Sequence, residues 1–297
     1  LGHRAEFAAL AGPPAPRALR LLARALGPVG RGPLLAGAEL TVFKAPEVLL
    51  SSVQDHHPGA LGFQRHAWQA TFDLDAQVFV TAPGRWSRPG PGAWGGNASL
   101  PRVIQVRDVL IALYRPGPAQ RAVFPRLTHA YFPRAAFDEL LEGGGWTCAR
   151  KGAGYVGLYS ARPTRWQERG PFAGRELIAD GAQNAWVCQV GSRAEDGSFA
   201  EFVRRLRASP PRRRNLGRLS LGPPELSFAA PDVGTLRVPW RGRPSLDGRP
   251  LPPAAHPRFD TRYAQTPWLG EGAIELRHAG YALRLDLEAG VRAGDGL

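Results

Sequence analysis

From about residue 38 onward, apolar and polar residues alternate with a period of two, in short runs separated by Gly, Pro and Asp. Such alternation predicts β-strands with one buried face. The runs do not alternate regularly with helical segments, which favours antiparallel over parallel sheets. We therefore expect a mainly β protein, an antiparallel β-sandwich of two or more layers (a supersandwich). The expected strands are 40–43, 48–53, 67–72, 77–81, 102–106, 109–114, 127–132, 146–150, 155–160, 175–178, 186–190, 218–221, 225–228, 236–240, 274–278 and 282–287.

Two segments within this region have the helical period of 3.6 instead. Segment 133–142 carries Phe137, Leu140 and Leu141 on one side and is followed by three consecutive glycines. Segment 196–208 starts with Asp and Ser residues that are suited to capping a helix, and its apolar residues recur three and four positions apart. We expect two short helices here. The apolar residues of the second are Phe199, Phe202, Val203 and Leu206.

Residues 1–37 have a different character from the rest of the chain. Within them, Leu19, Leu22 and Leu26 form an apolar stripe at helical spacing, and a Gly-Pro pair ends it. A glycine- and proline-rich linker follows. A helix this short cannot bury its own stripe. The helix must therefore pack on the following domain or be the end of a missing helical domain of the same protein, and one β-sandwich domain is expected at 38–297.

The net charge of +13, from 38 basic and 25 acidic residues, first suggests a nucleic-acid partner. Only Lys44 and Lys151 are lysines, however, and an excess of Arg, Ala, Gly and Pro is typical of a GC-rich genome. The arginines are also scattered along the chain, so we expect no nucleic-acid partner. No apolar run approaches the roughly 18 residues of a membrane span, and no membrane partner is expected.

One dense arginine cluster stands around a Ser-Pro-Pro turn. We favour a solvent-exposed helix end and loop that makes few contacts, because we expect nothing acidic nearby in sequence to pair with it. A surface that binds a polyanion, for example an acidic polysaccharide, is the alternative. The cluster consists of Arg204, Arg205, Arg207, Arg212, Arg213, Arg214 and Arg218.

Cofactor and metal signals are weak. The chain has no P-loop, no His-Glu-x-x-His, no Gly-x-Ser-x-Gly and no Cys-x-x-Cys motif, so no cofactor is expected. Cys148 and Cys188 lie in apolar runs and are expected to be buried thiols, with a single disulfide open if the protein is secreted. His56 and His57 would point to opposite faces of a strand. We therefore expect no metal site.

Polar and aromatic residues are concentrated between residues 51 and 132. In a strand, His66 would share a face with Trp68, and His129 would share one with Tyr131. Aromatic rings stack on the apolar face of a sugar, while amides, imidazoles and charged groups bind its hydroxyls. The pattern therefore indicates a carbohydrate site. The candidate residues are Gln54, Asp55, His66, Trp68, Gln69, Trp94, Asn97, Arg102, His129 and Tyr131.

For several of these residues a structural role is an open alternative. Trp68, His66 and His129 could equally be satisfied members of the core. Trp94 stands in a glycine-rich loop, where burial is harder, and is the better candidate for stacking on a sugar.

Four blocks in this region, LSSVQD (50–55), HAWQAT (66–71), WGGN (94–97) and THAYFP (128–133), occur in this order and spacing. They resemble a large family of bacterial and fungal proteins whose C-terminal β-rich region carries the series LSSAQDYRPG…HIWQATL…NYWAGNG…HAYFP. The resemblance covers roughly residues 40–210. His56 and His57 stand where the family has Tyr-Arg, so the resemblance gives neither histidine an obligatory ligand role.

The architecture of that family is similar to heparinase II/III-like and hyaluronate-lyase-like proteins, in which a helical toroid precedes antiparallel β-sandwich layers. The resemblance therefore implies a carbohydrate-active architecture by analogy. It also implies that residues 1–37 are the end of the toroid, and that the chain has only one side of an interdomain cleft.

These observations together predict the β-sandwich portion of a polysaccharide-processing enzyme, a lyase or a hydrolase, with an oligo- or polysaccharide as its partner. In a lyase, His66 or His129 would be the base, Tyr131 the acid, and Asn97, Gln69 or Arg102 would neutralise a uronate carboxylate. A paired carboxylate site would favour hydrolysis. Two alternatives remain: a non-catalytic carbohydrate-binding or structural module, and a polyanion-binding protein.

Overall fold

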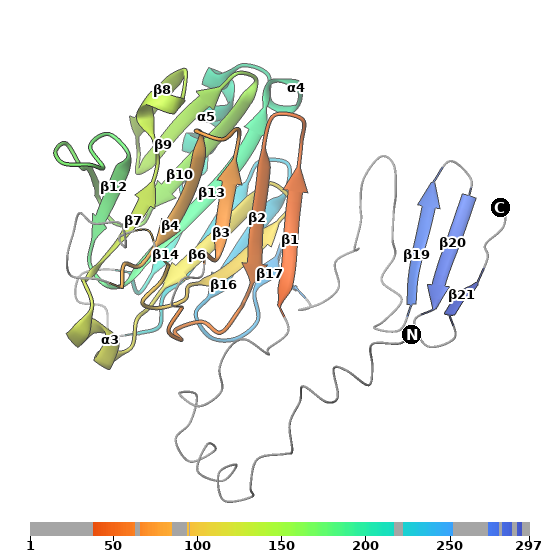
Figure 1. Cartoon of the computed structure of the whole chain (residues 1–297), viewed down its shortest axis with the longest axis horizontal. Helices are drawn as coiled ribbons and strands as arrows, with labels where there is room; N and C mark the ends of the chain where they lie inside the picture. Colours follow the sequence, from red (N-terminus) through yellow and green to blue (C-terminus); the bar gives the residue numbers. More distant parts are fainter. Residues whose placement is uncertain are drawn as a thin grey trace, which may run out of the picture.

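The computed structural model describes residues 38–62, 66–84, 94, 96–216, 222–251, 273–278, 281–286 and 290–292. In this part of the chain, antiparallel sheets are stacked in layers (Figure 1). The expected mainly β, antiparallel sandwich is therefore confirmed. The predicted helical segment in 1–37 and the predicted strand 218–221 lie outside the described residues.

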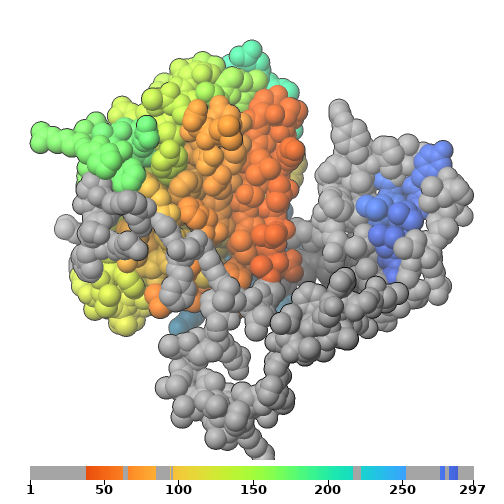
Figure 2. Space-filling view, in the orientation of Figure 1, coloured from red at the N-terminus to blue at the C-terminus, as the bar shows by residue number. Residues whose placement is uncertain are grey.

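The first layer is a seven-stranded sheet whose strands lie in the foreground of Figure 1. Alternation along each strand sends one set of side chains to the interior, such as Leu50, Trp68 and Val80, and the other set outward. Figure 2 shows β1 to β4 side by side at the surface of the molecule, in red to orange. In sheet order the strands are β1 (Glu39–Lys44), β2 (Leu49–Gln54), β3 (Trp68–Thr71), β4 (Gln77–Thr81), β7 (Leu127–Tyr131), β12 (Glu176–Asp180) and β11 (Thr164–Trp166).

The second layer is a six-stranded sheet that is buried on both faces. Every residue of its central strands β6, β13 and β10 is buried. This explains why these segments are nearly continuous apolar runs rather than clean alternations. In sheet order the strands are β5 (Arg102–Val106), β6 (Val109–Tyr114), β13 (Asn184–Ser192), β10 (Gly154–Ser160), β9 (Trp146–Lys151) and β8 (Glu139–Gly143).

The third layer combines helix α5 (Phe199–Ala208) with a five-stranded sheet. Both pack on the same face of the middle layer and share one apolar core with it. The sheet consists of β14 (Arg212–Arg214), β15 (Glu225–Ala230), β16 (Gly234–Pro239), β17 (Ser245–Leu246) and β18 (Arg249–Pro250). The remaining elements are α3 (Pro118–Val123), α4 (Arg193–Asp196) and a separate three-stranded sheet of β19 (Ala273–His278), β20 (Tyr281–Asp286) and β21 (Gly290–Arg292).

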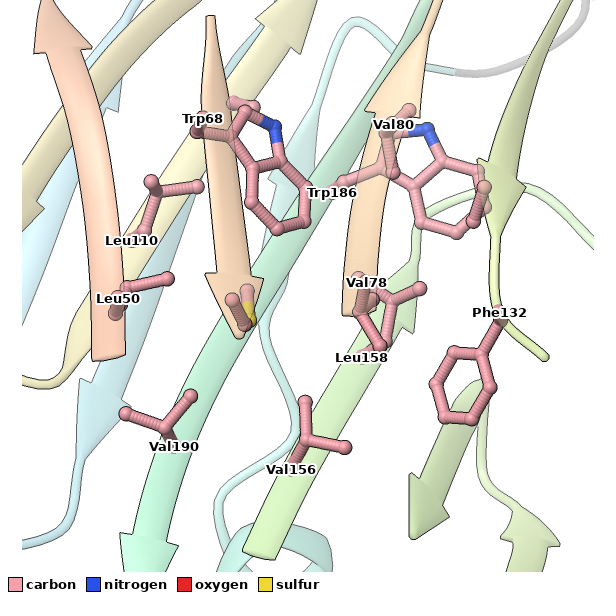
Figure 3. Close-up of a cluster of buried hydrophobic side chains, with 14 of the residues drawn as sticks. Leu50, Trp68, Val78, Val80, Leu110, Phe132, Val156, Leu158, Trp186 and Val190 are labelled. Atoms are coloured by element: carbon pink, nitrogen blue, oxygen red, sulfur yellow. The ribbon is translucent and has the colours of Figure 1, made fainter. Parts of the chain in front are cut away.

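The core between the first two layers is apolar with a few polar links. Figure 3 shows the indoles of Trp68 and Trp186 among aliphatic side chains from both sheets. The Trp186 indole N–H donates to Thr128 Oγ1 (2.9 Å) in the opposite sheet, and the Tyr114 hydroxyl donates to the Val80 carbonyl (2.8 Å). Because these two bonds each cross from one sheet to the other, they help to fix the register of the two layers.

One of the two predicted helices is wrong. Residues 133–142 form a 3₁₀ turn (Arg134–Ala136) and then strand β8, which pairs with β9. The glycines that follow have positive φ angles at Gly144 (62°) and Gly145 (83°), so they form the hairpin turn between β8 and β9 and do not cap a helix. The second predicted helix is confirmed as α5, which Ser198 caps by accepting a hydrogen bond from the Glu201 N–H.

Both cysteines are free and buried, as expected. Cys148 and Cys188 lie on β9 and β13, with β10 between them, and belong to cores on opposite faces of the middle sheet. They cannot form a disulfide with each other in this fold. Burial raises the pKa of the Cys148 thiol to about 12 and raises that of Cys188 as well, so both are unreactive thiols.

The carboxyl group of Asp108, in the turn between β5 and β6, makes stability depend on pH. Burial raises its pKa to about 6, although it accepts a hydrogen bond from Gln189 Nε2 (3.1 Å). Because this folded-state pKa lies above the unfolded value, the ionised form is disfavoured in the folded protein. Asp108 therefore costs stability as the pH rises from about 4 to 7.

We expect Asp108→Asn to remove this cost. Asn cannot ionise and keeps an oxygen that can accept the bond from Gln189. Since Asp108 is half-buried, the stability of the variant relative to the parent should rise by about 1–2 kcal/mol between pH 4 and pH 7. Urea unfolding at several pH values measures this difference. If the free energies of unfolding of the two proteins change with pH by the same amount, the prediction is wrong.

Candidate functional site

An aromatic cluster lies on the outer face of the seven-stranded sheet, over β4 and β7. Phe79 and Thr81 of β4 point outward because Val78 and Val80 belong to the core. On β7, His129 and Tyr131 point outward because Ala130 belongs to the core. Antiparallel pairing places Phe79 opposite Tyr131 and Thr81 opposite His129. The aromatic cluster comprises Phe79, Trp94, His129, Tyr131 and Phe172.

The half-buried Trp94 is at the centre of this cluster. Its indole stacks on the His129 imidazole, with ring centroids 4.0 Å apart and planes 10° apart. Phe79, Tyr131 and Phe172 meet its ring edge to face, at 5.6, 5.4 and 5.8 Å. Such contacts hold an aromatic side chain in a defined orientation.

Beneath Trp94, the His129 ring is completely buried. Its Nε2 lies 2.7 Å from Thr81 Oγ1, and its Nδ1 lies 2.6 Å from Glu176 Oε1. Glu176 is only 3% exposed. Both ring nitrogens are thus engaged, and the arrangement meets the hydrogen-bonding needs of a buried imidazole.

His66 borders the cluster but is exposed to solvent. Its Nε2 lies 3.1 Å from the Trp94 carbonyl oxygen, and its ring contacts Phe79 at 4.7 Å. The expectation that His66 shares a face with Trp68 is wrong: β3 begins only at Trp68, whose indole points into the core between the layers. The structure thus brings His66, Trp94, His129 and Tyr131 together as predicted.

Gln69 lies on the outer face of β3. Its amide Nε2 donates to Thr71 Oγ1 (2.9 Å) and to Gln77 Oε1 (3.3 Å), side chains on the same face. The residue is half-buried and faces the same side of the sheet as the aromatic cluster. It therefore remains a candidate for contacts with a ligand there.

Asp55 and Arg102 form a partly buried ion pair away from the aromatic cluster. Arg102 Nε and Nη2 donate to the two carboxylate oxygens of Asp55, each at 2.9 Å, and Nη1 donates to the Pro239 carbonyl of the third layer. The Arg102 side chain is 7% exposed. The pair joins strands of all three layers, and these contacts indicate a structural role.

Gln54 and Asn97 have internal partners as well. Gln54 Nε2 donates to Ser52 Oγ (2.8 Å), and its Oε1 accepts from the backbone N–H of Gln105 on β5 (2.9 Å). Asn97 is buried, and its Oδ1 accepts from the Ala82 N–H (2.9 Å). These contacts within the protein indicate structural roles for both side chains.

Sequence reasoning missed Thr81, Glu176, Phe79 and Phe172. Thr81 and Glu176 lie 48 and 47 residues from His129 in sequence. The one signal available for Glu176 was its place in an otherwise apolar run, Glu-Leu-Ile-Ala, where a buried position would need a partner.

The arginine cluster is only partly as expected. Arg204, Arg207, Arg212, Arg213 and Arg214 are exposed, as predicted, and Arg218 lies outside the described residues. The expectation of few contacts is wrong, because two of the arginines form ion pairs, mostly with carboxylates that precede them by only a few residues. Arg204 pairs with Glu201, and Arg205 pairs with Asp196 and Asp232.

In the part of the chain that the structure describes, no three His, Cys, Asp or Glu side chains are grouped closely enough to hold a metal ion. Helices within the same residues are too short or too polar to cross a membrane. Comparison of the chain with protein-family models, with curated proteins and with solved structures gave no match.

Proposed function

We propose that this chain is a carbohydrate-recognising β-sandwich of a polysaccharide-processing protein, and that it binds sugar at the aromatic cluster. The observation that carries the proposal is the orientation of Trp94, held by His129 on one face and by three aromatic edges. The resemblance of residues 40–210 to the family with heparinase-like architecture supports the same conclusion by analogy.

The cluster offers the two kinds of contact that a sugar needs. The accessible parts of Trp94 and Tyr131 are large aromatic surfaces suited to the apolar face of a pyranose. His66 and Gln69 lie on the same side of the sheet and supply ring nitrogens and an amide for hydroxyl groups. The site is therefore matched to a ligand that is apolar on its faces and polar at its edges.

Within this proposal, the contacts of His129 favour binding over catalysis. A general base must reach the proton that it removes. The ring of His129 is buried, and both of its nitrogens already have partners. His66 and Tyr131 are the accessible candidates for base and acid, so the enzymatic alternative, a lyase, rests on these two residues.

We expect Trp94→Ala to raise the Kd for the best-bound member of a panel of neutral and uronic-acid oligosaccharides at least tenfold, about 1.4 kcal/mol. The physical reason is the loss of the stacking surface. Isothermal titration of the full chain measures the Kd, and Tyr281→Ala serves as a control because Tyr281 is an exposed aromatic residue (56%) on another sheet.

Two results would contradict the proposal: a parent protein that binds nothing on the panel, or equal losses of affinity in Trp94→Ala and Tyr281→Ala. Incubating the parent with polygalacturonate and assaying for unsaturated products tests the lyase alternative. If such products form and disappear in Tyr131→Phe, catalysis replaces binding as the function of this cluster.

A further inference from the structure

Alternate arginines of strand β14 have different surroundings. Antiparallel pairing places Arg213 opposite Leu226, which belongs to the core, and Arg213 donates to the Ala161 carbonyl. Arg212 and Arg214 lie opposite Ser227 and Glu225, and therefore point to the outer face of the third layer. Strand β14 is an edge strand, so these two side chains stand at the open margin of the sheet.

Charge on this outer face is only partly compensated. Glu225 pairs with Arg237, and Glu201 at the start of α5 pairs with Arg204. Among the ion pairs of the described residues, none involves Arg207, Arg212 or Arg214, and all three are exposed. Arg207 lies in the last turn of α5, five residues before β14 begins at Arg212, and its guanidinium lies close to Gly143 at the end of β8.

Arg207, Arg212 and Arg214 are together called the arginine strip. Helix α5 and the five-stranded sheet pack on one face of the middle layer, and the seven-stranded sheet packs on the other. Figure 1 accordingly shows β14 behind the strands that carry the aromatic cluster. The strip is thus a separate surface, on the side of the molecule opposite the aromatic cluster.

We propose that the arginine strip binds an acidic polysaccharide. A guanidinium binds a carboxylate or sulfate group through two parallel hydrogen bonds, and three uncompensated guanidinium groups favour a ligand with repeated negative charges. Side chains two positions apart on a strand, such as Arg212 and Arg214, are roughly 7 Å apart, so one polymer chain can reach both. The choice of polymer rests on the function proposed above.

The surroundings of the strip favour a polysaccharide over nucleic acid. The outward side chains next to it on the sheet are small or charged: Ser227 and Ala229 on β15, Arg237 on β16 and Ser245 on β17. None of these offers an aromatic ring on which a base could stack. The hydroxyl groups of Ser227 and Ser245 can instead bind those of a sugar. A sheet face is also flat, whereas duplex grooves are read by a protruding helix or ribbon.

The test is binding of polygalacturonate to the full chain at several salt concentrations. We expect the triple variant Arg207→Gln, Arg212→Gln, Arg214→Gln to bind at least tenfold more weakly than the parent, with a shallower salt dependence because fewer counterions are released. A matched control replaces three other exposed arginines with glutamine, which changes the net charge equally. The control positions are Arg121, Arg126 and Arg169.

Thermal melting should show that both triple variants remain folded, since every replaced side chain is exposed. Equal losses of affinity in the two variants, or no loss in the strip variant, would overturn the proposal. Tighter binding of a random duplex DNA than of polygalacturonate through the same three arginines would overturn it in favour of nucleic acid.

The Trp94→Ala variant separates this proposal from the one for the aromatic cluster. If polygalacturonate binding is lost in the strip variant but kept in Trp94→Ala, the strip is confirmed independently of the aromatic cluster. If binding is lost in Trp94→Ala and kept in the strip variant, the proposal that the arginine strip binds the polymer is wrong. The proposal that the aromatic cluster binds sugar is then supported.

Discussion

Replacing Arg102 with methionine should lower the free energy of unfolding by about 3 kcal/mol. The guanidinium is nearly buried, pairs with both oxygens of Asp55, and donates to the carbonyl of Pro239. The substitution keeps most of the aliphatic volume but removes all three hydrogen bonds, so Asp55 and the Pro239 carbonyl lose a charged partner. Because the bonds join strands of three layers, we expect the whole sandwich to be weakened. Urea unfolding followed by tryptophan fluorescence measures this change.

Arg165→Met is the matched control for this prediction. Arg165 also makes two hydrogen bonds to one aspartate, Asp180, but the two side chains are 57% and 67% exposed. An exposed pair of this kind contributes about 0–1 kcal/mol. If the two variants unfold at the same urea concentration, burial does not set the strength of the Arg102 interaction and the prediction is wrong.

His129→Ala should also lower the free energy of unfolding by about 3 kcal/mol. The substitution removes the hydrogen bonds to Thr81 and Glu176, one of them to a charged group, and the ring on which Trp94 stacks. His129→Asn should recover part of this loss, since its amide nitrogen occupies nearly the place of Nδ1 and can donate to Glu176. Thermal and urea unfolding of the full chain measure both variants.

His57→Asn is the control for an exposed histidine. Its backbone has a positive φ of 46°, which asparagine adopts readily, so a change below about 0.5 kcal/mol is expected. If His129→Ala instead unfolds like the parent and abolishes sugar binding or turnover, His129 acts on the ligand and not on the fold. That result would reverse our interpretation of the buried imidazole.

The periodicity of the sequence is enough to predict most of the strands. For example, 77–81, 102–106 and 109–114 are strands with those bounds, because a short apolar run between turn residues is a local signal for a buried strand. Apolar spacing gave a wrong prediction at 133–142, where a helix was expected. Leu140 and Leu141 fit a helix by spacing, but pairing with β9 makes this segment an edge strand. Backbone pairing with the next strand of the hairpin outweighed the helical spacing of the apolar residues.

For the candidate site, the sequence identified which residue types could act but not which of them meet. His66, Trp94, His129 and Tyr131 come together because β4 and β7 are neighbours in the seven-stranded sheet. Asp55 and Arg102, in contrast, form an ion pair with each other, in which Arg102 is buried and Asp55 is exposed. No local pattern distinguishes these two outcomes, since both sets include polar residues in or beside short strands.

The sequence by itself therefore determined the β class, the burial of its two cysteines, the capped helix α5 and the presence of a strong positive charge. Only the tertiary structure decided the number of layers, the burial of His129 between Thr81 and Glu176, and the side of β14 on which each arginine lies. The physical reason is that alternation and capping are set within a few residues. Layer order and polar pairing instead depend on contacts between residues about 50 or more positions apart.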